Sequence, residues 1–321
     1  MDRRNAWFLN FDAEDELARP AGYTPSRAMR ARMSALVEKV RALLGPGDVV
    51  LEEGPSGIVE LRGEEASRQT EGELRGMAWC PTPRAEKALG RVGVTLGARP
   101  PLAVLQAVNH RRFSAALGQT LPGARFAGTP DEVWAALAGE SPTGRWLLKR
   151  AHGYAGRGRL EVEPGRSGDL ERARKWVEAS LRAGGGLQVE PRVERCGDFA
   201  IHGYLRASGE GESAGAGVVL GEPTRQTCDR AGAWVQSARA EPGDLSAEER
   251  EALFEEARRA GIALREAWYF GPFGVDAFRW TDARGQRHFN ARCEINARYS
   301  MGWAVGMGDR RPDLEGPGRP E

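Results

Sequence analysis

The chain has 321 residues and a formal charge of +1 at pH 7. This length predicts about two domains, or one domain with lobes, and is enough for a sizeable hydrophobic core. A charge so close to zero argues against a protein that binds nucleic acid or an anionic membrane through its overall charge.

The cysteines and the N-terminal residues indicate the cellular compartment. Cys80, Cys196, Cys228 and Cys293 are far apart and form no Cys-x-x-Cys pair, which argues against a zinc site and against a disulfide framework. The first residues lack the apolar stretch of a signal peptide, and no segment approaches the length of a membrane span. We therefore expect a soluble cytoplasmic protein with reduced cysteines.

The first hundred residues alternate between strand and helix patterns. Strands are predicted at 7–11, 49–51 and 77–80, and helices at 29–44 and 84–89. This alternation predicts a parallel, Rossmann-like lobe over residues 1–101.

The pattern changes after residue 102. A short helix is predicted to end near Gly118, followed by a helix at 133–138, a strand at 145–150 and a helix at 170–181. Strands at 187–193 and 199–205 follow, and later a capping box at Ser246 and Glu249 opens a helix that Gly261 is expected to close. We expect two α+β subdomains, at 102–186 and 187–306, and a disordered tail at 307–321.

Lys149 ends the apolar strand at 145–150, and Gly153, Gly156 and Gly158 follow it. An ammonium group beside a flexible glycine segment, whose backbone N–H groups can approach phosphate oxygens, is suited to binding a nucleotide. The segment is not a Walker loop, because the lysine precedes the glycines. A surface strand that leads into a mobile turn has the same pattern.

Glu190 and Asp198 form a second polar segment. A strand that leaves a glycine hinge, with an acid and exposed backbone, can hydrogen-bond an adenine edge, and a second acid can accept from ribose hydroxyls. Taken alone, the segment is more typical of an ordinary charged edge strand.

A predicted hairpin near the C-terminus carries the strongest signal. The turn signal at 282–285 joins two strands, and Glu294, Asn296 and Arg298 project from one face of the second strand. If the turn centres near Arg284, Asp276 on the first strand lies diagonal to Glu294 on the same face.

In this register Asp276 faces Arg292 directly. Two carboxylates about 4 Å apart repel by roughly 4 kcal/mol at an effective dielectric near 20, a cost that a cation between them removes. The oxygen ligands are those that magnesium prefers. The alternative is a solvated sheet face whose acids pair with Arg292 and Arg298.

Combined in this order, the segments resemble the ATP-grasp superfamily over residues 108–303. The resemblance implies an α/β ATP-grasp fold, with an N-terminal Rossmann-like lobe followed by two α+β subdomains that clasp the nucleotide. It implies that Lys149 contacts the nucleotide phosphates and that residues 153–158 form the loop that closes over them. The other implied nucleotide contacts are Gly153, Gly156, Arg157, Gly158, Glu190 at the adenine amino group, Val193 at the hinge and Asp198 at the ribose.

The resemblance also assigns the metal ligands and the reacting groups. Asp276, Glu294 and Asn296 match the ligands of Mg²⁺ (or Mn²⁺), and Arg298 matches the arginine near the transferred phosphoryl and acyl groups. A further basic residue at the start of a helix contacts ATP, and either Arg111 or Arg112 occupies that place here.

The implied activity is an ATP-dependent ligase that joins a carboxylate to an amine, or less readily to a thiol, through an acyl phosphate. Lys149 and Arg298 would be catalytic. The partners would be a small-molecule carboxylate and an amine, which could belong to a peptide, with no nucleic acid and no membrane; a homodimer is the default assembly. A kinase on the same fold and a non-catalytic ATP-binding regulator are the alternatives.

Two departures limit the resemblance. D-alanine ligase-like members carry an arginine shortly before the magnesium aspartate, whereas this chain has the segment 270–274 there, with the sequence FGPFG. The motifs of biotin-dependent carboxylases are not apparent either. The resemblance therefore stays with the superfamily.

Overall fold

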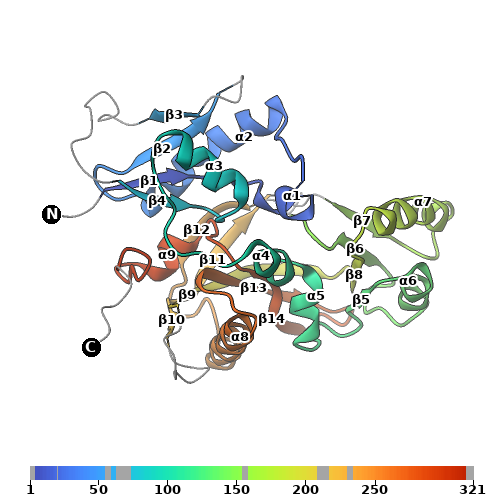
Figure 1. Ribbon diagram of the computed structural model, residues 1–321. Coiled ribbons are helices and arrows are strands. Elements are labelled where there is room, and N and C mark those ends of the chain that lie inside the picture. The colour runs from blue at the N-terminus through green and yellow to red at the C-terminus, as the bar shows by residue number, and fades with distance from the viewer. Residues whose placement is uncertain are drawn as a thin grey trace.

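A computed structural model of the chain describes residues 4–19, 21–54, 59–62, 74–153, 158–207, 217–229 and 234–315. These residues form three sheets. Figure 1 shows the N-terminal sheet with its helices as one lobe, the smallest subdomain to one side of it, and the large C-terminal sheet between them.

The N-terminal sheet has the strand order β3-β2-β1-β4. Its strands are β1 (Asn5–Phe8), β2 (Val49–Glu53), β3 (Val59–Arg62) and β4 (Arg75–Ala78). Strand β1 is parallel to both β2 and β4, and β3 is antiparallel to β2. The predicted parallel lobe is therefore present, although β3 was not predicted.

Strand β1 is buried on both faces, because helices cover both faces of this sheet, as is usual for parallel strands. Ala6 and Phe8 pack against one helix, and Trp7 packs into a different cluster on the opposite face. The helical segments are α1 (Ala13–Ala18), α2 (Arg27–Val37), the 3-10 helix η1 (Glu38–Leu43) and α3 (Pro83–Arg91).

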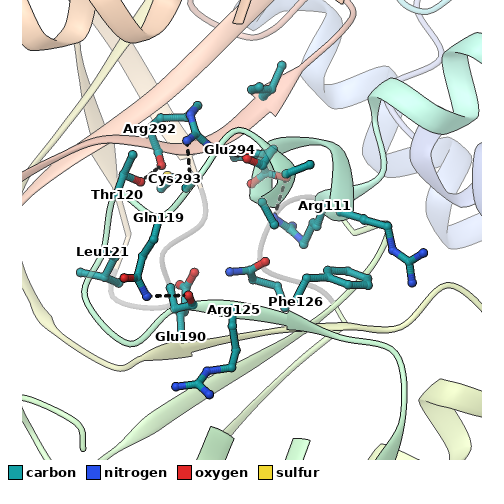
Figure 2. A pocket seen from close by; sticks show the side chains of 18 of the residues that line it. Arg111, Gln119, Thr120, Leu121, Arg125, Phe126, Glu190, Arg292, Cys293 and Glu294 are labelled. Atoms are coloured by element: carbon teal, nitrogen blue, oxygen red, sulfur yellow. Dashed lines mark hydrogen bonds and ion pairs between the residues drawn. The ribbon is translucent and has the colours of Figure 1, made fainter. Parts of the chain in front are cut away.

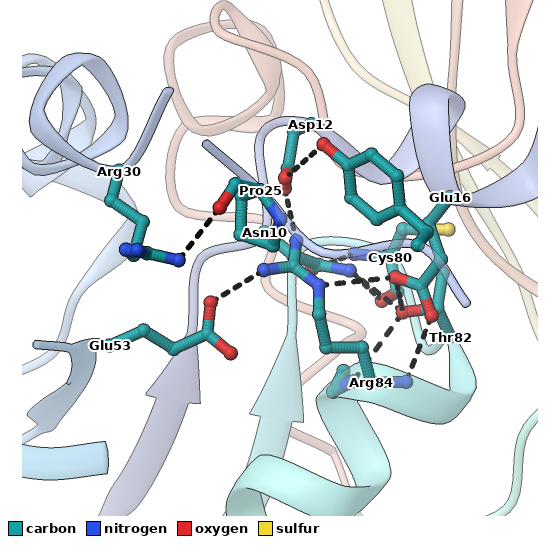
Figure 3. A network of polar contacts seen from close by, with 11 residues as sticks. Asn10, Asp12, Glu16, Pro25, Arg30, Glu53, Cys80, Thr82 and Arg84 are labelled. Carbon is teal, nitrogen blue, oxygen red and sulfur yellow. Dashed lines mark hydrogen bonds and ion pairs between the residues drawn. The ribbon is translucent and has the colours of Figure 1, made fainter. Parts of the chain in front are cut away.

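An ion network holds together the carboxyl edge of the sheet (Figure 3). The Arg84 guanidinium contacts the carboxylates of Asp12, Glu16 and Glu53, and it lies 2.7 Å from Glu53. Glu16 also accepts hydrogen bonds from the Thr82 hydroxyl at 2.7 Å and from the Arg84 backbone N–H at 2.9 Å. One cation thus links the ends of β1, β2 and β4.

The small sheet is antiparallel, with the order β5-β8-β6-β7. Its strands are β5 (Arg125–Ala127), β6 (Trp146–Arg150), β7 (Arg159–Val162) and β8 (Leu187–Pro191), and helices α6 (Pro130–Leu137) and α7 (Asp169–Arg182) pack on one face. Trp146 and Leu148 alternate into this helix-covered core. The opposite face, with Leu147 and Lys149, is therefore left for the rest of the chain.

The large sheet has the order β12-β11-β9-β13-β14, with β10 also paired to β9. Its strands are β9 (Glu194–Leu205), β10 (Val218–Leu220), β11 (Thr224–Cys228), β12 (Trp234–Arg239), β13 (Gly271–Thr281) and β14 (Arg287–Asn296). The helices around it are α4 (Leu102–Val108), α5 (Arg111–Ala116), α8 (Ala247–Glu266) and α9 (Trp303–Met307).

The N-terminal lobe and the large sheet share one hydrophobic core. Trp7 and Trp79 from the first lobe belong to the same buried cluster as Tyr299 and Trp303. The Trp7 and Tyr299 rings meet edge to face, with centroids 5.3 Å apart. The small sheet, in contrast, has a separate core under α6 and α7.

Three boundary predictions need correction. Strand β8 pairs with β5 and β6, so residues 187–191 belong to the first subdomain and the predicted break at 187 is too early. Gly261 does not end its helix, because α8 continues to Glu266; an added Cβ at Gly261 would lie 3.1 Å from Val218. The predicted tail is partly packed, since Asp313 is buried and accepts a hydrogen bond from Tyr299 at 2.9 Å. Residues 316–321 lie outside the described part.

Candidate active site

The C-terminal hairpin places two carboxylates directly opposite each other. Near the turn, Phe278 pairs with Asn290, as a turn centred on Arg284 predicts. A bulge then shifts the register, because β14 has three residues between the paired positions where β13 has one. As a result Asp276 pairs with Glu294 rather than with Arg292.

The bulge also removes Arg292 from the site. Its guanidinium donates to Glu256 on α8 at 2.6 Å and to the Gly118 carbonyl at 2.8 Å. The prediction that Arg292 faces Asp276 is therefore wrong.

Asp276 is held by two amide side chains. Gln226 on β11 donates to one carboxylate oxygen at 3.0 Å, and Asn296 donates to the other at 3.0 Å. Burial raises the pKa of Asp276, the charge of Glu294 raises it further, and the value reaches about 6. Asp276 therefore lacks a cationic partner strong enough to offset its neighbour.

Glu294 has the opposite environment. Its carboxylate lies 2.9 Å from the Arg111 guanidinium. Burial acts to raise the pKa of Glu294, but Arg111 and Lys149 outweigh burial and hold the pKa below its usual value. The two acids at one sheet position thus differ in the ease with which they lose a proton.

Arg111, rather than Arg112, faces the hairpin. Besides Glu294, its guanidinium donates to the Arg150 carbonyl at 3.0 Å and to the Gly153 carbonyl at 3.1 Å. The Arg112 guanidinium lies over the Phe126 ring, 5.0 Å from its centroid. Arg111 therefore connects the start of the glycine segment to the hairpin.

Lys149 and Glu190 form the corresponding pair on the small sheet. Strands β6 and β8 are adjacent, and the Lys149 ammonium lies 2.5 Å from the Glu190 carboxylate. Glu190 is 5% exposed, so this pair is largely shielded from water.

Arg298 is tied to the N-terminal lobe. It contacts Glu14 on α1, and it donates to the side-chain oxygen Oδ1 of Asn296 at 2.9 Å and to the backbone carbonyl of Tyr299 at 3.0 Å. A chain of polar contacts therefore runs from Glu14 through Arg298 and Asn296 to Asp276.

Val193, the predicted hinge residue, lies on the loop after β8, whereas Asp198, the predicted ribose contact, lies on β9. Val193 is buried beside Phe278. Asp198 lies 3.0 Å from Arg195, whose guanidinium covers the Phe278 ring at 3.9 Å from its centroid. Arg195 thus covers a buried aromatic ring and also lines the cleft.

The glycine segment is described only at its ends. Gly153 lines the cleft, and Gly158 has a φ of +67°, which favours glycine. Gly156 and Arg157 lie outside the described residues, so their predicted contacts stay predictions.

A cleft of about 500 Å³ lies between the small and large sheets. The predicted site residues that line it are Arg111, Lys149, Gly153, Asp198, Asp276, Glu294, Asn296 and Arg298. Glu190 lines an adjoining cavity of about 740 Å³. Figure 2 shows this second cavity, with Glu190 and Phe126 on one side and Arg111 and Glu294 on the other.

The sequence prediction missed three residues at this site, Glu14, Gln226 and Arg195. Each lines the cleft. Glu14 and Gln226 come from elements far from the recognised motifs, whereas Arg195 lies on β9 close to the predicted site residue Asp198. The described residues contain no group of three His, Cys, Asp or Glu side chains placed to hold a metal. The predicted metal set therefore depends on the Asn296 amide as its third ligand.

No family model matches the chain, and no curated protein matches its sequence. Solved structures do match its fold. D-alanyl-alanine synthetase A from Vibrio cholerae is 14% identical and covers 98% of this chain and 96% of its own, with a TM-score of 0.54. The chain has the ATP-grasp fold.

A biotin carboxylase from Campylobacter jejuni also shares the ATP-grasp fold. It is 14% identical and covers 94% of this chain and 67% of its own, with a TM-score of 0.53. The predicted fold class is thus confirmed. Within the described ranges, no helix is both long and apolar enough to cross a membrane.

Proposed function

We propose that the protein is an ATP- and magnesium-dependent ligase that joins a carboxylate to an amine through an acyl phosphate. The observation that carries the proposal is the opposition of Asp276 and Glu294, with Asn296 beside them, in one cleft with Lys149 and Arg298. Both fold neighbours support the ligase class, and the biotin carboxylase was solved as a complex with β-γ-ATP.

The donor set fits a hard divalent cation. Asp276 and Glu294 are opposed acids in one cleft, and burial together with the charge of Glu294 raises the pKa of Asp276. Asn296 adds an amide oxygen, and carboxylate and amide oxygens are ligands that Mg²⁺ accepts. When bound, the metal would bridge phosphate oxygens and neutralise the charge that develops during phosphoryl transfer.

The remaining groups suit the nucleotide and the acyl group. Lys149 and Arg111 are each paired with a carboxylate. The phosphate oxygens of a nucleotide triphosphate would replace these carboxylates as partners of the two cations. Arg298 lies beside the metal set, where its guanidinium would stabilise the oxygens of the acyl phosphate. Glu190 and the backbone near Val193 would bind the adenine, and Asp198 would bind the ribose.

The roles of the sheets follow from this assignment. The small sheet supplies Lys149 and Glu190, and the large sheet supplies the metal ligands, so ATP would bind between the two. Closing the glycine segment would exclude water from the acyl phosphate.

The test is a substrate screen with a chemical trap. Purified protein would be incubated with Mg²⁺, ATP, a library of carboxylic and amino acids, and hydroxylamine, and products would be identified by mass spectrometry. ADP together with a hydroxamate is the expected result. ADP with a phosphorylated product that is not an acyl group would instead show a kinase, and tight ATP binding with no turnover for any substrate would contradict the ligase.

A further inference from the structure

Glu14 has a buried carboxylate oxygen without a partner. The residue lies on α1 of the N-terminal lobe and is 4% exposed. One of its oxygens, Oε1, contacts Arg298. The other, Oε2, is buried and has no hydrogen-bond partner among the described residues. Burying a polar atom without a hydrogen-bond partner destabilises the protein, so this oxygen is a candidate to bind a ligand.

The position of Glu14 ties this oxygen to the reaction cleft. Glu14 lines the same cleft as Asp276 and Glu294. Arg298 contacts Glu14 and Asn296 at the same time, through the same nitrogen. Glu14 is therefore one side chain removed from the metal set, on the side of the N-terminal lobe.

The chemistry of Oε2 restricts the ligand. A carboxylate oxygen only accepts hydrogen bonds, so its partner must donate an N–H or O–H group. A carboxylate substrate would be repelled there by Glu14 and by the nearby charge of Glu294, which already acts on Glu14. A cationic amine has both the donor and the compensating charge.

We propose that Glu14 binds the ammonium group of the amine substrate through Oε2 and takes a proton from it. This inference rests on the ligase function proposed above. It identifies the acceptor as an amine that is bound as an ammonium cation and enters next to α1.

The proton and electron balance is as follows. The ammonium group transfers one proton to Glu14 and becomes a neutral amine. Its lone pair forms the new C–N bond at the carbonyl carbon of the acyl phosphate, and the C–O bond to phosphate breaks with its electron pair on the leaving phosphate. A second N–H proton then leaves to phosphate or solvent. Burial raises the pKa of Glu14, which makes it a stronger base than an exposed glutamate.

The variant Glu14→Gln isolates the unpartnered oxygen. The glutamine carbonyl oxygen can still accept from Arg298, while the amide NH₂ replaces Oε2 with a donor. The contact to Arg298 is therefore kept, and only the acceptor for the amine is lost. Asp15→Asn is the matched control, because it removes one negative charge from the same helix at a residue outside the cleft lining.

The first measurement separates the two half-reactions. Acid-dependent positional isotope exchange in β,γ-bridge-labelled ATP reports acyl phosphate formation without any amine. With the acid and amine from the screen, E14Q should lower amine-dependent product formation by about 100-fold or more, the usual contribution of a general base, and exchange by much less. D15N should stay within about twofold of wild type in both. Equal losses in exchange and coupling for E14Q would reduce Glu14 to a support for Arg298 and overturn the proposal.

The second measurement does not depend on the ligase function. Saturation-transfer NMR would detect methylammonium binding to wild type, E14Q and D15N, with tetramethylammonium as a cation that has no N–H donor. We expect a methylammonium signal in wild type and D15N that falls in E14Q to the level of tetramethylammonium. A signal unaffected by E14Q, or no excess over tetramethylammonium in wild type, would refute the amine site.

The two proposals fail in different ways. A silent substrate screen with Glu14-dependent methylammonium binding would reject the ligase and keep the site. If the screen gives a product but E14Q forms it as fast as wild type, the ligase proposal is kept and the amine site at Glu14 is rejected. If E14Q does not fold, Glu14→Asp keeps the charge but withdraws the oxygen, and it should give the same unequal loss of coupling and exchange.

Discussion

Asp276→Asn should stabilise the metal-free protein at high pH while abolishing turnover. The structure raises the pKa of Asp276 from 3.8 to about 6, and this rise corresponds to a penalty of about 3 kcal/mol on the ionised form. The asparagine removes the charge, but its NH₂ group replaces the carboxylate oxygen that accepts from Asn296. Two donors then face each other, which costs about 1–2 kcal/mol. The expected net gain at pH 8 is therefore about 1–2 kcal/mol.

The sign of the pH dependence follows from linkage. The native carboxyl has the higher pKa, so the native state binds more protons, and wild-type stability falls as pH rises from about 4 to about 6. Between pH 5 and pH 8 the stability of D276N relative to wild type should therefore grow by about 1.4 kcal/mol. Millimolar Mg²⁺ at pH 8 should stabilise wild type and leave D276N nearly unchanged, because ligand binding adds stability only to a protein that binds it.

Urea unfolding of both proteins at pH 5 and pH 8, with EDTA or with Mg²⁺, measures all of these quantities. A difference between the two proteins that does not change with pH would show that burial and Glu294 do not raise the pKa of Asp276. Equal stabilisation by Mg²⁺ in both proteins would remove Asp276 from the metal site.

Three further predictions test other parts of the site and fold. Lys149→Met should lower acid-dependent ADP release by about 100-fold or more, because it removes the ammonium group that would stabilise the transferred phosphoryl group, and the urea midpoint should also fall, because the buried Glu190 carboxylate loses its cation. Turnover is compared at a temperature where the variant is folded, and unchanged turnover would exclude Lys149 from the site. Arg84→Met should destabilise the protein by about 3–5 kcal/mol, because it leaves buried carboxylates without their cation, whereas Arg99→Met, which breaks an exposed pair with Glu86, should cost less than about 1 kcal/mol; similar losses in urea unfolding would contradict the role of the network. Gly186→Ala should destabilise by more than about 1 kcal/mol, because φ is +82° there and the new Cβ would lie 2.5 Å from Phe126; a neutral change in thermal unfolding would refute this.

The sequence predicted the polar residues of the hairpin but could not predict their register. Turn chemistry determines pairing only near the turn, and there the prediction agrees with the structure. The bulge between Asn290 and Glu294 depends on packing, since Arg292 turns towards Glu256 on α8. Local patterns do not contain that information.

The sequence reasoning missed Glu14 and Gln226 for one physical reason, which is that their partners are distant in the sequence. Glu14 and Arg298 are 284 positions apart, and Gln226 and Asp276 are 50 apart. The first pair forms only when α1 packs against the end of the hairpin, and the second forms only when β11 and β13 take their places on either side of β9 in the large sheet. Periodicity and spacing therefore cannot reveal either pair. By contrast, the capping box of α8 is local, and the structure has it at Ser246 and Glu249, where the sequence places it.

The shared core of the first lobe and the large sheet determines which part of the molecule can move. Trp7, Trp79, Tyr299 and Trp303 join these two regions, so separating them would expose large aromatic surfaces to water. The small sheet has its own core and is connected to the rest by short segments around residues 117–125 and 191–194. We therefore expect substrate exchange to occur by rotation of the small sheet as a rigid lid over a fixed base, with Lys149 and Glu190 travelling together and Glu14 and Arg298 remaining in place.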